Sequence, residues 1–456
     1  MDREKLEGEN RKLHILQVHD YYKISGGEDR VVENERELLR EHGHKVWLYA
    51  RRNGELAKMT PWEKLCLPFT TVFSLKTYRE VKRLIREKKI DVVHVHNTLP
   101  LISPSVFYAA FAAGVPAVMS VHNFRLLCPG ALFFRNGKVC EECVERGLHR
   151  SVRYGCYRGS RAQTLLCAVS MKLHRIAGTY RRIYYICLTD FNREKLLKLK
   201  GIRPDRVFVK PNFAEVGENN REEKREKGRI EIEKEEEREE EKRERGGEEG
   251  REREERERGE EGRECEERER EGEWKDYFLY GGRLEEEKGV KVLLRAFRRL
   301  KDETLVICGE GSLAGWCQEY VKKHAMENVV LKGAVSGGEL KALMGRAKGV
   351  IVPSLWYEGF PMVIAEAYSV KTPVIGSDAG NVGRLVGEYG GRTFETGNVK
   401  ALAEAVESCG KEQEISAAGK ERAGTGIKEW SGEGNYRKLM QIYGRCMADV
   451  WKTKEK

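Results

Sequence analysis

The chain has 456 residues, 35% of them charged, and a formal net charge of +10. This length allows two or three domains, since single domains usually run to about 100–200 residues. No run of roughly 18 or more apolar residues is present, and the charged start MDREKLEGENRK lacks the apolar segment of a secretory signal. We therefore expect a cytoplasmic protein, and peripheral contact with a membrane stays open.

The charge is unevenly distributed along the chain. Residues 217–273 hold 17 Lys and Arg against 27 Asp and Glu, so the remainder has 67 basic and 47 acidic residues. A basic remainder favours an anionic ligand, an anionic membrane surface or nucleic acid. Its positive charge is spread over many predicted helices, and no recognised nucleic-acid module or aromatic platform is visible. We therefore expect no nucleic acid among the partners.

Strands and amphipathic helices alternate through residues 1–213, which we predict to be the first domain. Such alternation is typical of a parallel sheet covered by helices on both faces. The predicted strands are 14–22, 45–51, 90–97, 115–123, 184–190 and 206–212, and the predicted helices are 31–43, 81–89, 107–114 and 191–201.

Residues 214–274 interrupt this alternation with a Glu- and Arg-rich tract that has no aromatic residue between Phe213 and Trp274. Such a composition buries too little apolar surface to order itself by packing. We interpret the tract as a solvated insert or linker, with a regulatory or binding arm as the alternative.

The alternation resumes in a second predicted domain, residues 275–426, and the final segment 427–456 is expected to be a helix that packs back on the first domain. The fold class is therefore α/β, with two doubly wound, Rossmann-like domains facing a cleft. Ligands of such sheets bind at the carboxyl ends of the strands. The predicted strands here are 277–284, 304–311, 328–335, 349–354 and 372–378, with helices at 290–300, 316–325, 339–347 and 399–408.

Three segments that follow predicted strands carry the candidate site. In YGGRLEEEKG, Arg283 and Lys288 lie beside a helix start, where fixed positive charge and backbone N–H groups suit a diphosphate. A pair of solvated charges is the alternative. In HDYYKISGGEDR, Gly26 and Gly27 let the backbone approach a ligand or form an ordinary turn. No G-x-G-x-x-G is present, which counts against a dinucleotide oxidoreductase.

The third segment, PSLWYEGFPMVIAEA, places Glu358 in the loop before a helix and Glu366 one to two turns into it. Two acids in those places suit opposite sides of one ligand. A carboxylate pair that acts as acid and nucleophile, as in glycoside hydrolases, is the competing interpretation, but the neighbouring diphosphate site argues against it. His122 ends the strand AVMSVHN at the edge of the cleft, whereas we interpret His94 as structural.

Together these segments resemble the retaining nucleotide-sugar glycosyltransferases of family 4, which have the GT-B architecture. The resemblance covers nearly the whole chain except the charged insert. It implies that Glu366 binds the ribose hydroxyls of the nucleotide and that Glu358 and His122 lie by the donor sugar. It further implies the roles of the remaining residues: phosphate neutralisation by Arg283 and Lys288, backbone contacts to the donor from Gly359, Phe360 and Met362, and close approach of Gly26 and Gly27 to phosphates or acceptor.

The reaction that the resemblance implies needs no protein nucleophile and no cofactor, because the departing phosphate helps to deprotonate the acceptor. Two positions depart from the family pattern. Gly383 stands where many relatives carry glutamate, and Phe213 stands where relatives often have glycine. Either change could leave the fold intact while altering the ligand geometry.

A cysteine cluster in the first domain gives one further prediction. Cys128, Cys140, Cys143 and Cys156 lie within a Gly-rich stretch, a pattern compatible with a tetrahedral zinc or iron–sulfur site. Free thiols or a loop disulfide are the alternative. Most of the other cysteines lie singly among apolar or helical stretches and are expected to be buried reduced thiols: Cys66, Cys167, Cys187, Cys308, Cys317, Cys409 and Cys446.

We expect a retaining hexosyltransferase that moves a sugar from a nucleotide-diphosphate donor to a glycan, a lipid-linked molecule or another cell-envelope acceptor. The basic runs at 76–89 and 174–185 suggest contact with an anionic membrane surface, with solvated helix faces as the alternative. The alternative function is a catalytically silent GT-B scaffold or partner-binding protein, in which the charged insert is the working part.

Overall fold

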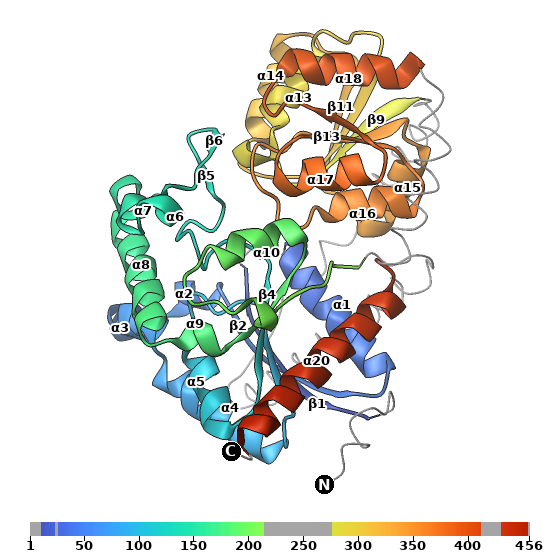
Figure 1. Cartoon of the computed structure of the whole chain (residues 1–456). Helices are drawn as coiled ribbons and strands as arrows, with labels where there is room; N and C mark the ends of the chain where they lie inside the picture. The colour runs from blue at the N-terminus through green and yellow to red at the C-terminus, as the bar shows by residue number, and fades with distance from the viewer. Residues whose placement is uncertain (1–10, 23–25, 214–275, 412–429, 455–456) are drawn as a thin grey trace, which may run out of the picture.

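The computed structural model describes residues 11–22, 26–213, 276–411 and 430–454 (Figure 1). The predicted charged insert therefore lies outside the described residues. The two parts on either side of it each build one six-stranded parallel sheet.

The first sheet has the strand order β2-β1-β3-β4-β7-β8. Its strands alternate in sequence with helices, so every connection crosses over a face of the sheet, as parallel pairing requires. The strands are β1 (His14–Tyr21), β2 (Lys45–Arg52), β3 (Val92–Val95), β4 (Ala117–Val121), β7 (Tyr184–Cys187) and β8 (Val207–Val209).

Successive residues of these strands point to opposite faces and build two separate cores. On one face, Leu16 packs in the cluster that contains helices α4 (Leu75–Glu87) and α5 (Ser105–Ala113). On the other face, Ile15 packs in the cluster that contains α1 (Gly27–Glu41) and α20 (Gly432–Lys454). The helix at the end of the chain thus covers a face of the first sheet (Figure 1).

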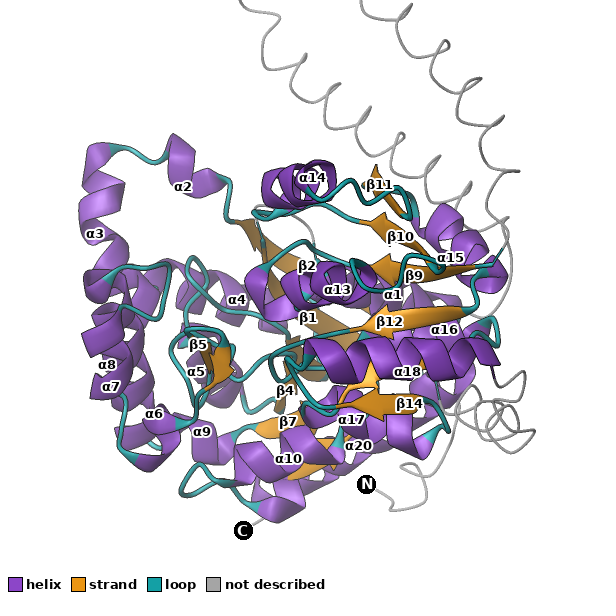
Figure 2. Ribbon diagram, turned by 90° about the horizontal axis from the view of Figure 1, so that it is seen from above, coloured by secondary structure: helices purple, strands orange, loops and turns teal. Residues whose placement is uncertain are grey.

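Between these elements the first domain carries a helical flank that was not among the helices predicted from the sequence. Its main helices are α3 (Pro61–Val72) and α8 (Arg161–Ile176), which lie beside each other at one edge of the molecule (Figure 2). Thr60 begins α3 with a capping box. The smaller elements of the domain are α2 (Glu55–Lys58), β5 (Phe134–Arg135), β6 (Lys138–Val139), α6 (Glu142–Glu145), α7 (His149–Tyr154), α9 (Thr179–Arg182), α10 (Asp190–Leu197) and the 3-10 helix η2 (Pro204–Arg206).

The second sheet has the strand order β11-β10-β9-β12-β13-β14. Its strands are β9 (Tyr277–Gly281), β10 (Thr304–Cys308), β11 (Val329–Gly333), β12 (Gly349–Val352), β13 (Val374–Ser377) and β14 (Arg392–Phe394). Its helices are η3 (Glu286–Lys288, a 3-10 helix), α13 (Val290–Phe297), α14 (Ala314–Lys323), α15 (Gly337–Arg346), α16 (Met362–Ser369), α17 (Gly380–Glu388) and α18 (Val399–Lys411). The predicted α/β fold of two doubly wound domains is confirmed, whereas the exact domain limits stay a prediction.

Hydrogen bonds between α10 and α17 join the two domains near the carboxyl ends of their sheets (Figure 1). Thr189, just before α10, donates its hydroxyl proton to the Asn381 side-chain oxygen at 2.7 Å. The Asn381 amide in turn donates to the backbone oxygen of Gly359 at 2.9 Å, and Asn192 donates to the same oxygen at 2.7 Å. The segment that carries both candidate glutamates is therefore held from both domains.

Candidate functional site

Glu358 lies in the loop that follows β12 and is only 6% exposed. The Lys288 ammonium is 2.8 and 3.1 Å from its two carboxylate oxygens, and the Ser354 hydroxyl donates to Oε1 at 2.7 Å. Burial acts to raise the pKa of this carboxyl, but the Lys288 charge and these hydrogen bonds outweigh it and hold the pKa below its usual range. Glu358 is therefore an ionised carboxylate, and both of its oxygens accept hydrogen bonds.

The backbone conformation of Gly289 allows Lys288 to reach Glu358. Gly289 has a φ of +76°, and a Cβ atom there would lie 1.8 Å from the backbone oxygen of Pro353. The chain between η3 and α13 can thus pack directly on the loop after β12, where Leu355 donates its N–H to the Glu287 backbone oxygen at 2.8 Å. The other predicted phosphate ligand, Arg283, keeps a side chain that is 54% exposed and lies 3.4 Å from Glu287.

Glu366 lies in the second turn of α16, as the sequence analysis predicted, whereas the helix begins at Met362 with Pro361 as its N-cap. Burial raises the pKa of the Glu366 carboxyl. Across the domain boundary, the Arg30 guanidinium on α1 is 3.6 Å from one Glu366 oxygen. The first turns of α1 and the body of α16 therefore face each other.

Gly359 and His122 touch, although they come from different domains. A Cβ atom on Gly359 would lie 2.2 Å from the backbone oxygen of His122, closer than real Cβ contacts allow. His122 follows β4 directly, at the carboxyl end of the first sheet. The structure thus brings the predicted strand-end histidine against the predicted donor-binding turn formed by Gly359, Phe360 and Met362.

Gly26 and Gly27 are the N-cap and the first residue of α1. The Gly26 N–H donates to the Asp29 carboxylate at 3.1 Å. No described atom lies within 4 Å of the position of a Cβ on either glycine, so the described part of the chain leaves space beside both. That space leaves room for a ligand at the start of α1.

Comparisons with known proteins agree with this geometry. The sequence profile described as Glycosyltransferase Family 4 matches residues 25–217, and the profile described as Glycosyl transferases group 1 matches residues 263–424. The chain belongs to glycosyltransferase family 4. Its two domains have the GT-B architecture of that family.

Among curated relatives of this family 4 chain, a glycogen synthase of Mycobacterium tuberculosis is 36% identical over 136 residues, which cover 28% of this chain and 33% of the relative. The O-antigen chain mannosyltransferase B of Escherichia coli is 32% identical over 127 residues, covering 26% and 32%. The matched segments thus span about a third of these relatives.

Solved structures match nearly the whole family 4 chain. A glycosyltransferase from Rickettsia africae covers 96% of this chain and 99% of its own length, with a TM-score of 0.63 at 16% identity. Anabaena HepE in complex with UDP covers 94% and 99%, with a TM-score of 0.59 at 15% identity. These likenesses concern the fold.

A half-buried acid beside the site was not predicted from the sequence. Glu28, in the first turn of α1, accepts hydrogen bonds from the Tyr22 hydroxyl at 3.1 Å and the Asn123 amide at 3.4 Å. Burial raises the pKa of its carboxyl to about 7. The signal was an acidic residue directly after the two glycines, which by itself is also typical of an ordinary helix start.

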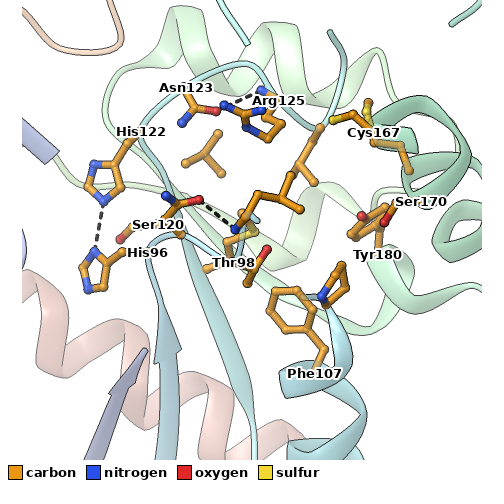
Figure 3. A pocket seen from close by; sticks show the side chains of 17 residues that line it. His96, Thr98, Phe107, Ser120, His122, Asn123, Arg125, Cys167, Ser170 and Tyr180 are labelled. Atoms are coloured by element: carbon orange, nitrogen blue, oxygen red, sulfur yellow. Dashed lines mark hydrogen bonds between the residues drawn. The ribbon is translucent and has the colours of Figure 1, made fainter. Parts of the chain in front are cut away.

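A cavity of about 40 Å³ lies behind His122, between the loop after β4 and helix α8 (Figure 3). His122 and His96 are at one side of it, and Arg125 and Cys167 are at another. This volume accommodates one or two water molecules rather than a sugar. The cavity therefore lies beside the candidate site and does not form it.

The two departures from the family pattern have structural explanations. A Cβ atom on Gly383 would lie 2.6 Å from the backbone oxygen of Asp378, so this arrangement of α17 has no room for a side chain there. Phe213 is buried at 4% exposure and lies near Gly432, at the start of α20. Phe213 thus helps to attach the last helix of the family 4 chain.

The four clustered cysteines lie in one loop region but do not bring three sulfur atoms together. Within the described part of the chain, one group has three donor atoms within 4.8 Å of one another, namely Glu35, His94 and His96. The Lys210 ammonium, 3.2 Å from Glu35, places a fixed positive charge in that group, which disfavours a metal ion. The cysteine metal site stays a prediction.

Proposed function

We propose that this family 4 protein is a retaining glycosyltransferase that transfers a hexose from a nucleotide-diphosphate sugar to a glycan, a lipid-linked molecule or another cell-envelope acceptor. The observation that carries the proposal is the meeting of Lys288, Glu358, Gly359 and His122 where the carboxyl ends of the two sheets face each other. Glycosyl transfer from such donors needs positive charge at the departing diphosphate beside a site for the sugar.

Different charged groups of the site would bind different parts of such a donor. Lys288 and the exposed Arg283 side chain lie at the end of β9, where they would neutralise the diphosphate. Glu366 would accept hydrogen bonds from the ribose hydroxyls. HepE, with the same fold, was solved with UDP and with UDP-glucose, which supports a nucleotide-sugar donor here.

The state of Glu358 favours transfer without a protein nucleophile. A glycosidase nucleophile must present a carboxylate oxygen to the sugar carbon, with a second carboxyl group about 5–5.5 Å away. Here both Glu358 oxygens contact Lys288, and one also accepts from Ser354. We infer that Glu358 fixes Lys288 and orients the turn, and that the leaving phosphate assists deprotonation of the acceptor.

A panel of UDP-, GDP- and ADP-sugars tests the proposal. We expect release of nucleoside diphosphate from one donor class, with kcat/KM reduced by about 100-fold or more in Glu366→Ala and in Arg283→Ala, because each removes a charge-assisted contact to the nucleotide. Arg298→Ala, a change of an exposed arginine on the same domain, is the matched control and should keep the wild-type rate. Nucleotide binding without turnover of any donor would instead favour the silent scaffold.

We also propose that the first domain docks on an anionic membrane surface, through an apolar face on α3 and α8. Among the described residues, most large exposed apolar side chains gather on these helices and the turn after α3. Phe69 on α3 is 77% exposed and Ile176 on α8 is 73% exposed. The apolar face comprises Trp62, Leu65, Phe69, Leu165, Val169, Leu173 and Ile176.

The charges around the apolar face favour lipid over a second copy of the chain. Helix α8 has no acidic residue, and exposed basic side chains lie on and beside both helices: Lys58, Lys64, Lys76, Arg79, Arg161 and Lys172. Two such faces would repel each other, whereas anionic headgroups attract them while the aromatic side chains enter the interface. No helix of the described residues is long and apolar enough to cross a membrane.

Vesicle co-sedimentation tests this face. We expect the protein to sediment with vesicles that contain anionic lipid, and the Trp62→Ser, Phe69→Ser, Ile176→Ser triple variant to bind at least about tenfold more weakly. Val139→Ser, which changes an exposed apolar residue away from the face, is the control. Wild-type protein that stays in the supernatant at low salt would refute the proposal.

We propose, finally, that the cysteine loop holds a structural zinc ion that the transfer itself does not require. The four cysteines Cys128, Cys140, Cys143 and Cys156 support this, because all are free thiols within one loop region and thiolate sulfur is a preferred zinc ligand. Elemental analysis should find about one zinc per chain in wild type and much less in Cys128→Ser. Purified protein without metal would count against the site.

A further inference from the structure

A row of buried side chains leads from helix α1 to His122. The His122 Nε2 atom is 2.9 Å from Nδ1 of His96, and the two rings are stacked (Figure 3). On its other side, the His96 Nε2 atom faces Oε1 of Glu35 at 3.6 Å. His96 is fully enclosed, whereas His122 is partly exposed beside the donor-binding turn.

The carboxylate at the start of this row is ionised. Glu35 is 1% exposed, and its Oε2 atom is 3.2 Å from the Lys210 ammonium. Its Oε1 atom accepts from the Gln17 amide at 3.3 Å and lies 2.9 Å from the His94 ring. Burial acts to raise the pKa of Glu35, but the neighbouring His94 and Lys210 outweigh it and hold the pKa well below its usual range.

An ionised Glu35 decides which nitrogen of each ring carries the proton. Without a proton, His96 Nε2 would direct its lone pair at a carboxylate in a buried place, which is unfavourable; with a proton, the contact is attractive. His96 is a neutral ring, since burial lowers its pKa to about 3. A neutral ring that is protonated on Nε2 has an unprotonated Nδ1, so Nδ1 must accept its hydrogen bond from His122 Nε2–H.

The same reasoning determines the tautomer of His122. With its proton on Nε2, a neutral His122 has a lone pair on Nδ1, and that atom has no hydrogen-bond partner among the described residues and is directed away from His96 (Figure 3). We propose that Glu35 is a positioning residue that acts through His96 to hold His122 as an acceptor for a hydroxyl of the bound sugar. The proposal rests on the proposed function, because the donor sugar supplies that hydroxyl.

The last helix of the chain takes part in holding the row. Asn435 on α20 accepts from the Lys210 ammonium at 2.8 Å, and the Tyr443 hydroxyl is 2.7 Å from the His94 ring. Lys210 follows β8, so the ion pair with Glu35 joins β8, α1 and α20. The carboxylate thus stays in place beneath the strand ends of the first sheet.

The tautomer can be read directly by nitrogen NMR of ¹⁵N-histidine-labelled protein without any donor. The His122 signals are assigned by their loss in His122→Gln. We expect Nε2 of His122 to be protonated and Nδ1 to be unprotonated in the wild type, with the opposite or a mixed pattern in Glu35→Gln. Protonated Nδ1 in the wild type, or an unchanged pattern in Glu35→Gln, would overturn the proposal.

Activity gives a second readout with a matched control. With the active donor, we expect kcat of Glu35→Gln to fall about 10- to 100-fold, as for loss of a residue that orients a functional histidine, with the affinity for nucleoside diphosphate unchanged. The double change Glu35→Gln, Lys210→Met keeps the test valid if the unpaired lysine prevents folding. Tyr436→Phe, on the same helix, removes a contact to His44 outside the row and should keep the wild-type tautomer and rate.

These readouts also separate the proposal from the proposed function. If no donor is turned over, the proposed function fails, while the tautomer seen by NMR still supports or overturns the role of Glu35. If transfer occurs but Glu35→Gln has wild-type kcat and tautomer, Glu35 is only a structural residue.

Discussion

Lys288→Ala is expected to lower the free energy of unfolding of the protein by about 3 kcal/mol and to abolish measurable sugar transfer. The stability loss follows because Glu358, only 6% exposed, would keep a buried charge without its ion-pair partner. The loss of transfer follows because the cation nearest to the proposed diphosphate site is removed. Denaturant unfolding and donor turnover measure the two effects.

A second variant separates these effects. Lys288→Ala combined with Glu358→Gln removes the unpaired charge, so most of the lost stability should return, whereas transfer should not. Lys348→Ala is the matched control, since Lys348 forms a comparable ion pair with Glu303 at 2.6 Å in the same domain. It should cost less stability and leave turnover unchanged. Full activity of Lys288→Ala would refute a role of Lys288 in transfer.

Gly359→Ala is expected to reduce kcat/KM by about 100-fold or more while each domain stays folded. The added Cβ would lie 2.2 Å from the His122 backbone oxygen, so the proposed donor-binding turn must move away from the first domain. A displacement of about 1 Å at the reacting groups is enough for such a loss. Donor turnover and the radius of gyration from solution scattering measure the effect.

Gly387→Ala provides the control for that experiment. Gly387 lies in α17 of the same domain, and no described atom lies within 4 Å of the position of its Cβ. Alanine there should keep the wild-type rate and slightly favour the helix. Wild-type kcat/KM in Gly359→Ala would show that the contact with His122 does not persist in the working enzyme.

The helical flank shows where sequence patterns failed. In α8, residues 161–176, apolar side chains recur at helical spacing, but some of them lie on a face that is exposed to solvent. Their spacing therefore does not show which face packs on the core. For the cysteine-rich stretch before α8, the sequence pattern predicted a metal site and no helix. Whether Leu173 and Ile176 are exposed depends on which elements pack next to the helix, and local periodicity does not predict those elements.

Glu35 shows the same limit at the candidate site. In GEDRVVENERELLRE it is one of five glutamates on an amphipathic helix, where solvent exposure is the ordinary expectation. Its neighbour His94 lies in β3, which pairs with β1, and His96 follows that strand directly. Lys210 follows β8 at the far edge of the sheet. Their meeting depends on strand order and on the rotation of α1, and neither follows from the sequence of α1.

The sequence by itself determined the alternation of strands and helices, the family resemblance and the placement of Gly26, His122, Glu358 and Glu366 at the ends of strands and the starts of helices. These are local properties, set by periodicity and by turn residues over a few positions. Only the tertiary structure decided which of these groups touch. The Lys288–Glu358 pair spans 70 residues of sequence, and the contact of Gly359 with His122 crosses between domains. Such contacts depend on sheet register and domain packing, because burial and charge pairing act between groups that only the folded chain brings together.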